Sequence, residues 1–236
     1  QRVYDQTTGA VEELGRYLGL KKAPYRMECF DISHMQGSET VASMVVFEGG
    51  VAKKSDYRRF KIRSAEGKPD DFKSMREVTT RRYGAPDAEM PDLIVIDGGK
   101  GQLSSALEII RGAGHLLVPV VGLAKREEEV FREGESEPVI LPRDSQALFL
   151  IQRIRDEAHR FAITYHRRLR GKRNMVSVLD HIEGIGPKRR QLLYEHYGEL
   201  EKIKEASVEE MAGLDGMNRP AAEAVYNFFL AQRNLR

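Results

Sequence analysis

The chain has 236 residues, enough for one larger domain and one smaller one. Its formal net charge is +2, so the overall balance neither requires nor excludes a polyanionic partner. A single cysteine, Cys29, excludes an internal disulfide framework, and no apolar run is long enough to span a bilayer or to act as a signal segment. We therefore expect a soluble, cytoplasmic protein without a membrane partner, and the opening Gln1-Arg2-Val3-Tyr4, without an initiator Met, indicates a fragment.

Two elements are predicted before residue 40. Residues 7–18 have the apolar spacing of a helix, and Gly19 is a plausible stop. Residues 25–35 are predicted to form a strand in which Asp31 stands within a mostly apolar run. A buried unpaired carboxylate is costly, so Asp31 needs a cation or hydrogen-bond donors. For a single aspartate, capping a turn or pairing with an arginine is the more common outcome.

Two further strands follow, at residues 40–48 and 57–62, and with the first strand they are predicted to form an antiparallel meander. Pro69-Asp70-Asp71-Phe72 then begins a helix that runs toward Arg82. Either aspartate of this run could be the N-cap, which is the usual role of aspartate at such a position.

A second aspartate follows Leu93-Ile94-Val95-Ile96, a run that is typical of a strand covered on both faces. Gly98-Gly99 turns the chain into a helix, so Asp97 stands at the carboxyl end of its strand, where ligands bind in open α/β sheets. Asp31 and Asp97 could converge there on a hard divalent cation, Mg²⁺ or Mn²⁺, which prefers oxygen ligands. The glycines lack the spacing of a nucleotide-binding P-loop, and we exclude that site.

A strand at 118–124 and a charged hairpin at 127–132 and 139–141 precede the longest helix, which begins at Asp144-Ser145. His159 borders the apolar stripe of that helix. His166 lies seven residues later, so periodicity does not choose between the two. A histidine beside an apolar face is more often structural than a ligand. The helix also has the densest basic patch of the chain, suited to phosphate contacts: Arg153, Arg155, Arg160, Arg167, Arg168, Arg170, Lys172 and Arg173.

Residues 171–176 are polar and basic and are predicted to be a linker. Beyond them, residues 182–190 and 211–217 each place a glycine-bearing turn between helical stretches, an imperfect internal repeat. Amides at the start of the following helix could bind a backbone phosphate. Two αα-hairpins with glycine C-caps are the structural alternative. The order of residues in the first copy favours DNA binding there: Gly184, Gly186, Lys188 and Arg189.

Three runs resemble the signature sequences of the UvrC family and occur in the same order. The resemblance covers nearly the whole chain. The runs are Cys29-Phe30-Asp31-Ile32-Ser33-His34, Ile96-Asp97-Gly98-Gly99-Lys100-Gly101-Gln102 and Arg155-Asp156-Glu157-Ala158-His159-Arg160-Phe161-Ala162. The resemblance is to the C-terminal half of that family, the nuclease of bacterial nucleotide excision repair.

The resemblance implies an α/β fold with two domains. Residues 1–170 would form an RNase H-like mixed sheet flanked by helices, and residues 177–236 a small all-α tandem helix-hairpin-helix domain, joined by the linker. By position, the family's catalytic residues fall on Asp31, Asp97 and His159, and its further acid falls in Asp70-Asp71, where we prefer Asp71. Residues expected to contact DNA are Arg155, Arg160, Arg167, Arg168, Gly184, Gly186, Lys188 and Arg189.

The resemblance also implies a divalent-metal-dependent endonuclease that makes the 5′ incision on the damaged strand, within the SOS response. Asp31, Asp97 and His159 would hold Mg²⁺ or Mn²⁺. The partners would be damaged double-stranded DNA and the UvrB–DNA pre-incision complex. The family's 3′-incising domain and its UvrB-binding segment have no counterpart in these residues, so we expect neither the 3′ cut nor that recruitment contact. The second hairpin has Asp215 where the family has glycine.

Two other interpretations stay open at this point. Another RNase H-like nuclease, acting on RNA–DNA hybrids or branched DNA, would have similar acids and a different substrate. A non-catalytic DNA-binding platform would retain the fold, and the presence of Asp31 and Asp97 argues against it. Metal binding would decide between a platform and an enzyme.

Overall fold

The computed structural model describes residues 1–35, 39–64, 70–126 and 129–234. They form two compact units, residues 1–163 and residues 164–236, which are described separately below. Within the described ranges, no helix is both long and apolar enough to cross a membrane.

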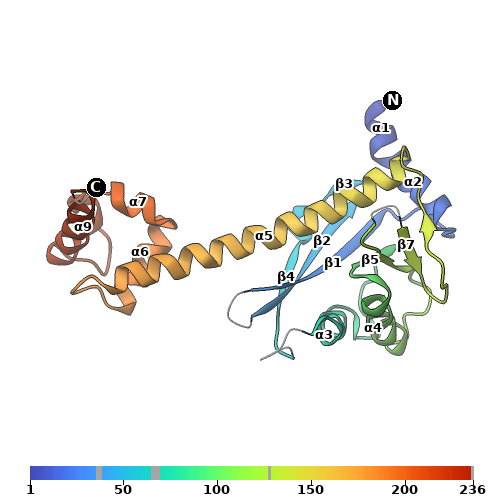
Figure 1. Cartoon of the computed structure of the whole chain (residues 1–236), viewed down its shortest axis with the longest axis horizontal. Coiled ribbons are helices and arrows are strands. Elements are labelled where there is room, and N and C mark those ends of the chain that lie inside the picture. Colours follow the sequence, from blue (N-terminus) through green and yellow to red (C-terminus); the bar gives the residue numbers. More distant parts are fainter. Residues whose placement is uncertain (36–38, 65–69, 127–128, 235–236) are drawn as a thin grey trace. The chain divides into compact units, whose positions relative to one another are not determined.

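The first unit is built on a mixed sheet of eight strands (Figure 1). The interior strand β1 (Arg26–His34) pairs antiparallel with β2 (Thr40–Glu48) and parallel with β5 (Leu93–Asp97). β5 pairs in turn with β6 (Val120–Leu123), again in parallel. The carboxyl ends of β1, β5 and β6 therefore lie at one edge of the sheet.

Short antiparallel strands extend this sheet on both sides. β3 (Val51–Ala52) and β4 (Arg58–Ile62) both pair with β2, and the turn η1 (Lys54–Asp56) lies between them. β7 (Glu129–Arg132) pairs with β6, and β8 (Val139–Ile140) pairs with β7. The predicted meander and hairpin are confirmed, whereas the two-residue strand β3 was not predicted.

One face of the sheet is covered by α3 (Asp71–Tyr83) and α4 (Gly99–Gly112) (Figure 1). Phe30 of β1 points to this face, because its ring meets the ring of Tyr83 edge-on at 5.7 Å. Side chains alternate between the two faces along a strand, so Asp31 points to the other face.

That other face carries the first part of α5 (Gln146–Asp180), which is the longest helix. The short helix α1 (Arg2–Gln6) leads into α2 (Thr8–Tyr17), which packs beside the start of α5. A carboxylate oxygen of Glu13 in α2 accepts a hydrogen bond from the amide of Ala147 in α5 at 2.9 Å. The expected helices and the RNase H-like mixed sheet flanked by helices are confirmed.

The described residues of the second unit, 164–234, contain helices and turns and no strand. The unit contains the end of α5 followed by α6 (Pro187–Tyr197), α7 (Leu200–Glu205), α8 (Val208–Ala212) and α9 (Arg219–Arg233). This unit has a hydrophobic core of its own, which includes Met175, Leu179, Leu193, Met211 and Val225.

The expected linker is helical. Residues 171–176, expected to be a linker, lie inside α5, which continues unbroken to Asp180. Lysine and arginine are good helix formers, and one glycine costs a helix only about 1 kcal/mol, so a polar composition does not exclude a helix. Burial of Met175 in the core of the second unit also holds these residues in place. Pro69 and residues 127 and 128, expected at the starts of a helix and a hairpin, lie outside the described residues.

A buried carboxylate joins β1 to α3. The side chain of Glu28 is fully buried and accepts hydrogen bonds from Arg26, from Arg82 at 2.9 Å and from the Tyr83 hydroxyl at 2.6 Å. Burial and the adjacent carboxylate raise the pKa of Tyr83 well above its usual value, so the phenol stays protonated and donates. The network satisfies a charge that would otherwise be costly in the core.

We predict that Glu28→Ala lowers the free energy of unfolding by about 3–5 kcal/mol, because it removes one partner of a buried ionic network. Urea unfolding followed by circular dichroism measures this loss. The matched control is Glu108→Ala, which breaks an exposed pair with Arg76 and should cost less than about 1 kcal/mol. Equal losses in the two variants would contradict the structural role of Glu28.

Candidate active site

Two aspartates lie side by side at the edge where the parallel strands end. Asp31 of β1 and Asp97 of β5 are partners in the parallel register, and neighbouring strands are about 4.8 Å apart. Their side chains are 13% and 6% exposed, on the face that α5 covers. The structure therefore brings together the two acids that the sequence singled out.

His159 of α5 meets both aspartates. Its Nε2 atom lies 2.7 Å from Oδ2 of Asp97 and 4.0 Å from Oδ2 of Asp31. One ligand atom from each residue lies within 4.8 Å of the other two, and we call this group the Asp–Asp–His cluster. In the described part of the chain, no other set of three His, Cys, Asp or Glu side chains gathers this closely. His166, the alternative histidine, is not in the cluster.

The surroundings of Asp31 disfavour its charged form. Burial, and then the charge of Asp97, raise the pKa of Asp31 to about 6, while His159 and Arg155 act in the opposite direction. Two like charges at this separation favour a cation between or beside them. Half of the His159 side chain is open to solvent, with 47% of its surface exposed, so the cluster is accessible from outside.

Arg155 lies at the cluster rather than on an open surface. We expected it to contact DNA phosphates, but its side chain is only 15% exposed and faces the cluster. Its Nε lies 3.1 Å from Oδ1 of Asp97, and Nη1 donates to the carbonyl of Ala124 at 3.1 Å. Arg155 precedes His159 by four residues, one helical turn, so both reach Asp97 from the same side of α5.

The adjacent acids at the start of α3 have different surroundings. Asp70 is the N-cap, and its Oδ1 accepts hydrogen bonds from the amides of Phe72 at 3.1 Å and Lys73 at 3.0 Å. Asp71 is the first helical residue, and its carboxylate is not used for capping. This arrangement supports the preference for Asp71 as the further acid.

Asp71 is held beside the Asp–Asp–His cluster by two side chains. Its Oδ1 lies 2.5 Å from Nε2 of His34, and Gln102 donates to its Oδ2 at 3.3 Å. The other ring nitrogen of His34 lies 3.0 Å from the hydroxyl oxygen of Thr40. The charge of Asp71 adds to the raised pKa of Asp31, although Asp71 lies outside the three-residue cluster.

Sequence reasoning did not assign His34 and Gln102 to the site. Both lie in the signature runs, three residues after Asp31 and five after Asp97, and that proximity is the signal that could have found them. The Oε1 atom of Gln102 is buried and has no hydrogen-bond partner among the described residues. A Cβ at Gly98 would lie 2.1 Å from that oxygen, so glycine there leaves room for Gln102.

Three of the expected DNA-contacting arginines lie farther along α5. Arg160 is exposed and bound to both oxygens of Glu157, at 2.7 and 2.6 Å. Arg167 and Arg168 belong to the second unit, where they line a hollow of about 570 Å³ together with Tyr194. Their exposure is compatible with phosphate contacts.

Comparisons with known proteins show which protein family this chain belongs to. Residues 15–163 match the model described as the UvrC RNAse H endonuclease domain, and residues 176–229 match the SAM-like helix-hairpin-helix tandem. The chain belongs to the UvrC RNase H endonuclease family. The resemblance stated from the sequence is therefore confirmed.

Two relatives of this UvrC family member are both named UvrABC system protein C. The one from Desulforudis audaxviator is 45% identical over 97% of this chain and 40% of its own length. The one from Symbiobacterium thermophilum is 48% identical over 93% of this chain and 39% of its own length. The chain thus spans about 40% of the length of these curated relatives. A crystal structure of human ENDOV aligns with 70% of this chain at a TM-score of 0.32 and 10% identity.

The two turns of the UvrC helix-hairpin-helix tandem are tied together by one arginine. Gly184 and Gly216 have φ angles of +82° and +96°, a region that favours glycine. Arg189 donates to the carbonyl of Gly184 at 2.9 Å and to that of Gly216 at 3.4 Å. Lys188 is exposed, and Gly186 is the N-cap of α6. Arg189 therefore supports both turns, while Lys188 is open to solvent.

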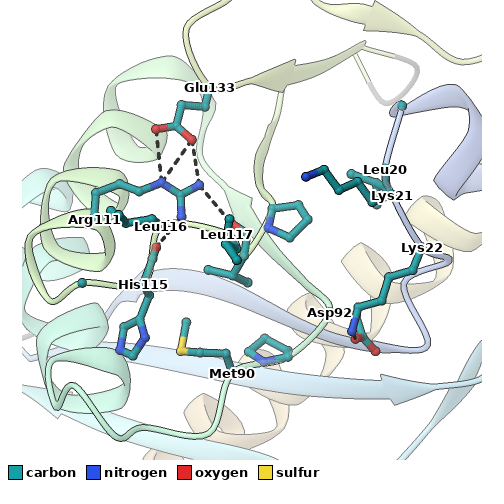
Figure 2. Close-up of a pocket in the computed structure, with 15 residues that line it drawn as sticks. Leu20, Lys21, Lys22, Met90, Asp92, Arg111, His115, Leu116, Leu117 and Glu133 are labelled. Atoms are coloured by element: carbon teal, nitrogen blue, oxygen red, sulfur yellow. Dashed lines mark hydrogen bonds and ion pairs between the residues drawn. The ribbon is translucent and has the colours of Figure 1, made fainter.

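A separate cavity of about 870 Å³ opens where β5 and β6 begin (Figure 2). Arg111 lies along it and binds Glu133 at 2.7 Å. Leu116 and Leu117 also line the cavity and are largely exposed, Leu117 by 90%. Because Asp97 is at the carboxyl end of β5, this cavity is at the opposite end of the strand from the cluster.

We predict that Arg189→Ala destabilises the helical unit by about 1–3 kcal/mol, because two backbone carbonyls lose a charged donor. The matched control is Lys188→Ala, which removes the same charge from the adjacent exposed position and should leave stability unchanged. Thermal unfolding of both variants measures the difference. If Arg189→Ala unfolds at the same temperature as Lys188→Ala, the two hydrogen bonds do not support the turns.

Proposed function

We propose that this chain is a divalent-metal-dependent DNA endonuclease that makes the 5′ incision on the damaged strand in bacterial nucleotide excision repair. The observation that carries the proposal is the Asp–Asp–His cluster at the carboxyl ends of β1 and β5. Membership of the UvrC RNase H endonuclease family, and relatives named UvrABC system protein C, support it.

The donor set of the cluster fits Mg²⁺ or Mn²⁺. Two carboxylates and one imidazole suit Mn²⁺, and carboxylate oxygens are the usual protein ligands of Mg²⁺. The raised pKa of Asp31 reflects its burial and then repulsion from Asp97, and a bound cation would offset both effects. When bound, the metal would polarise the scissile phosphate and lower the pKa of a water molecule. We assign Asp71 as a further catalytic acid, next to Asp31, Asp97 and His159.

The chain's own residues prepare the site for that chemistry. Arg155 binds Oδ1 of Asp97 and so orients the carboxylate, with Oδ2 directed to His159. His159 is a metal ligand or exchanges a proton with solvent through Nε2, since its ring is half exposed. His34 and Gln102 hold the carboxylate of Asp71 from both sides. The acids thus need little reorganisation to act on a phosphodiester.

DNA binding is assigned mainly to the helix-hairpin-helix tandem, in a domain of residues 177–236 that follows a nuclease domain of residues 1–170. Gly184, Gly186 and Lys188 would contact phosphates at the first hairpin. Arg160, Arg167 and Arg168 on α5 would add further phosphate contacts. Such contacts are independent of base sequence, so specificity for damage would come from the UvrB–DNA complex. The reaction would take place in the cytoplasm, on chromosomal DNA.

We predict that Asp31→Asn and Asp97→Asn each abolish Mn²⁺ binding, measured by calorimetry, and slow DNA cleavage more than about 100-fold. Affinity for DNA should stay close to that of the wild type, because phosphate contacts lie elsewhere. Asp92→Asn is the control, since Asp92 precedes β5 at the opposite end of the strand and pairs with Lys22. Unchanged Mn²⁺ binding in both site variants would make the acids structural and favour the DNA-binding platform.

Substrate choice separates this proposal from other RNase H-like nucleases. With UvrB and a damaged duplex, the protein should cut 5′ to the lesion. RNA–DNA hybrids and branched DNA without UvrB should be cut far more slowly. Preferential cutting of either would replace the repair function with that of the corresponding nuclease.

We predict that DNA affinity falls steeply with salt and that Lys188→Ala reduces the slope of log K against log[salt] by about 1, because one phosphate contact is lost. Fluorescence anisotropy with duplexes of different sequence measures both the slope and the lack of base preference. Lys21→Ala, at the cavity near the start of β5, should leave the slope unchanged. A slope that is insensitive to Lys188 would exclude it from the interface.

A further inference from the structure

Four side chains form a row across the sheet at the level of the cluster. Arg59 of β4 pairs with Ser43 of β2, Ser43 pairs with Asp31 of β1, and Asp31 pairs with Asp97 of β5. Residues directly opposite one another on paired strands share a face of the sheet. Arg59 therefore lies on the same face as the two aspartates. Two strand spacings, about 10 Å, separate it from Asp31.

The guanidinium of Arg59 rests on the helix that carries His159. Its Cζ lies 3.7 Å from the centroid of the Phe161 ring, and Nη2 donates to the carbonyl of Phe161 at 3.4 Å. Phe161 also packs against Tyr57, whose ring meets the Phe161 ring edge-on at 5.1 Å. These contacts fix the position of an exposed cation relative to the cluster.

The row between Arg59 and Asp31 contains no other charge. Ser43, the residue between them, is fully buried and neutral. The acids and the guanidinium therefore lie on opposite flanks of α5, with opposite charges on one face of the sheet. A phosphate held at the acids by a cation would have its neighbour on the same strand drawn toward Arg59.

The spacing suits a DNA strand. Each strand of duplex DNA has a phosphate about every 3.4 Å along the axis, so a strand with one phosphate at the cluster presents another within about 10 Å. A guanidinium has five N–H donors and can bind a phosphate with two of them while it stacks on an aromatic ring. Arginine is suited to this double contact, and lysine reproduces only its charge.

We propose that Arg59 and its Phe161 platform form a binding site for a phosphate of the cut strand that flanks the scissile one. The inference rests on the proposed nuclease function and adds a substrate contact to it. Arg59 holds the strand in register, and it takes no part in the bond-breaking step. Its loss affects binding and positioning of DNA more than turnover of bound DNA.

The test compares three substitutions in the full chain. Arg59→Ala should raise KM for the damaged duplex, and the Kd measured in an Asp97→Asn background, by about 10-fold or more. Arg59→Lys should recover only part of this loss. Arg58→Ala is the matched control, because Arg58 is on the same strand but points to the other face, where it donates to backbone carbonyls. It should leave KM and Kd unchanged.

Phe161→Leu tests whether Arg59 binds DNA or only supports α5. This variant keeps Arg59 and removes its aromatic platform, and we expect an intermediate rise in KM with no change in the number of bound Mn²⁺ ions. If Arg59→Ala is poorly folded, Arg59→Lys and Arg59→Gln provide the same comparison. A lower kcat and melting temperature with an unchanged KM would make Arg59 a structural support and overturn the inference.

The two proposals fail in different ways. If the wild-type protein cuts the damaged duplex and the Arg59 variants match it in KM and Kd, the flanking-phosphate site is wrong and the nuclease function stands. If the wild type, with UvrB and Mn²⁺, cuts no DNA, the nuclease function is wrong, and this inference fails with it.

Discussion

The repulsion between Asp31 and Asp97 is the interaction on which the rest of the first unit depends. Two carboxylates on neighbouring parallel strands are stable only if positive charge or hydrogen-bond donors meet them. The protein supplies these from α5, through Arg155 on one oxygen of Asp97 and His159 on the other. The placement of α5 over the sheet is thus tied to neutralising the acids. The remaining excess of negative charge is what a divalent cation would offset.

Strand β1 contains a second carboxylate, Glu28, whose hydrogen bonds are fully satisfied within the protein. Glu28 is three residues before Asp31, points to the α3 face and is fully buried. Arginine and tyrosine donors surround it, so it has no capacity left for a ligand. Asp31 is partly exposed, and a second carboxylate is its neighbour. Burial alone therefore does not distinguish a candidate site acid from a structural one. Glu28 is surrounded by fixed hydrogen-bond donors, whereas Asp31 has a second carboxylate as its neighbour.

Much of this arrangement follows from sequence, because the positions and ends of strands are indicated by local residue patterns. The run before Asp97 and the glycines after it place that acid at a strand end, and the structure agrees. Basic composition was less informative. Arg155 and Arg189 are in basic stretches, yet one faces Asp97 and the other binds backbone carbonyls. Their directions depend on how a helix is rotated against its neighbours, which composition does not encode. Composition likewise failed to predict the helix through residues 171–176, because packing of Met175 in the core of the second unit stabilises it.

α5 links the Asp–Asp–His cluster to the contact between Phe161 and Arg59 of β4. Arg155 and His159 are one turn apart on one flank and reach β5, while Glu157 and Phe161 are one turn apart on the other flank and contact Tyr57, the residue before β4. Ala158, between the flanks, is fully buried against the sheet. A rotation of the helix would move both flanks in opposite directions, toward one strand and away from the other. Rotation of the whole helix is therefore the movement that would couple the acids to Arg59, whereas a substitution of one side chain on one flank leaves the buried contact of Ala158 in place.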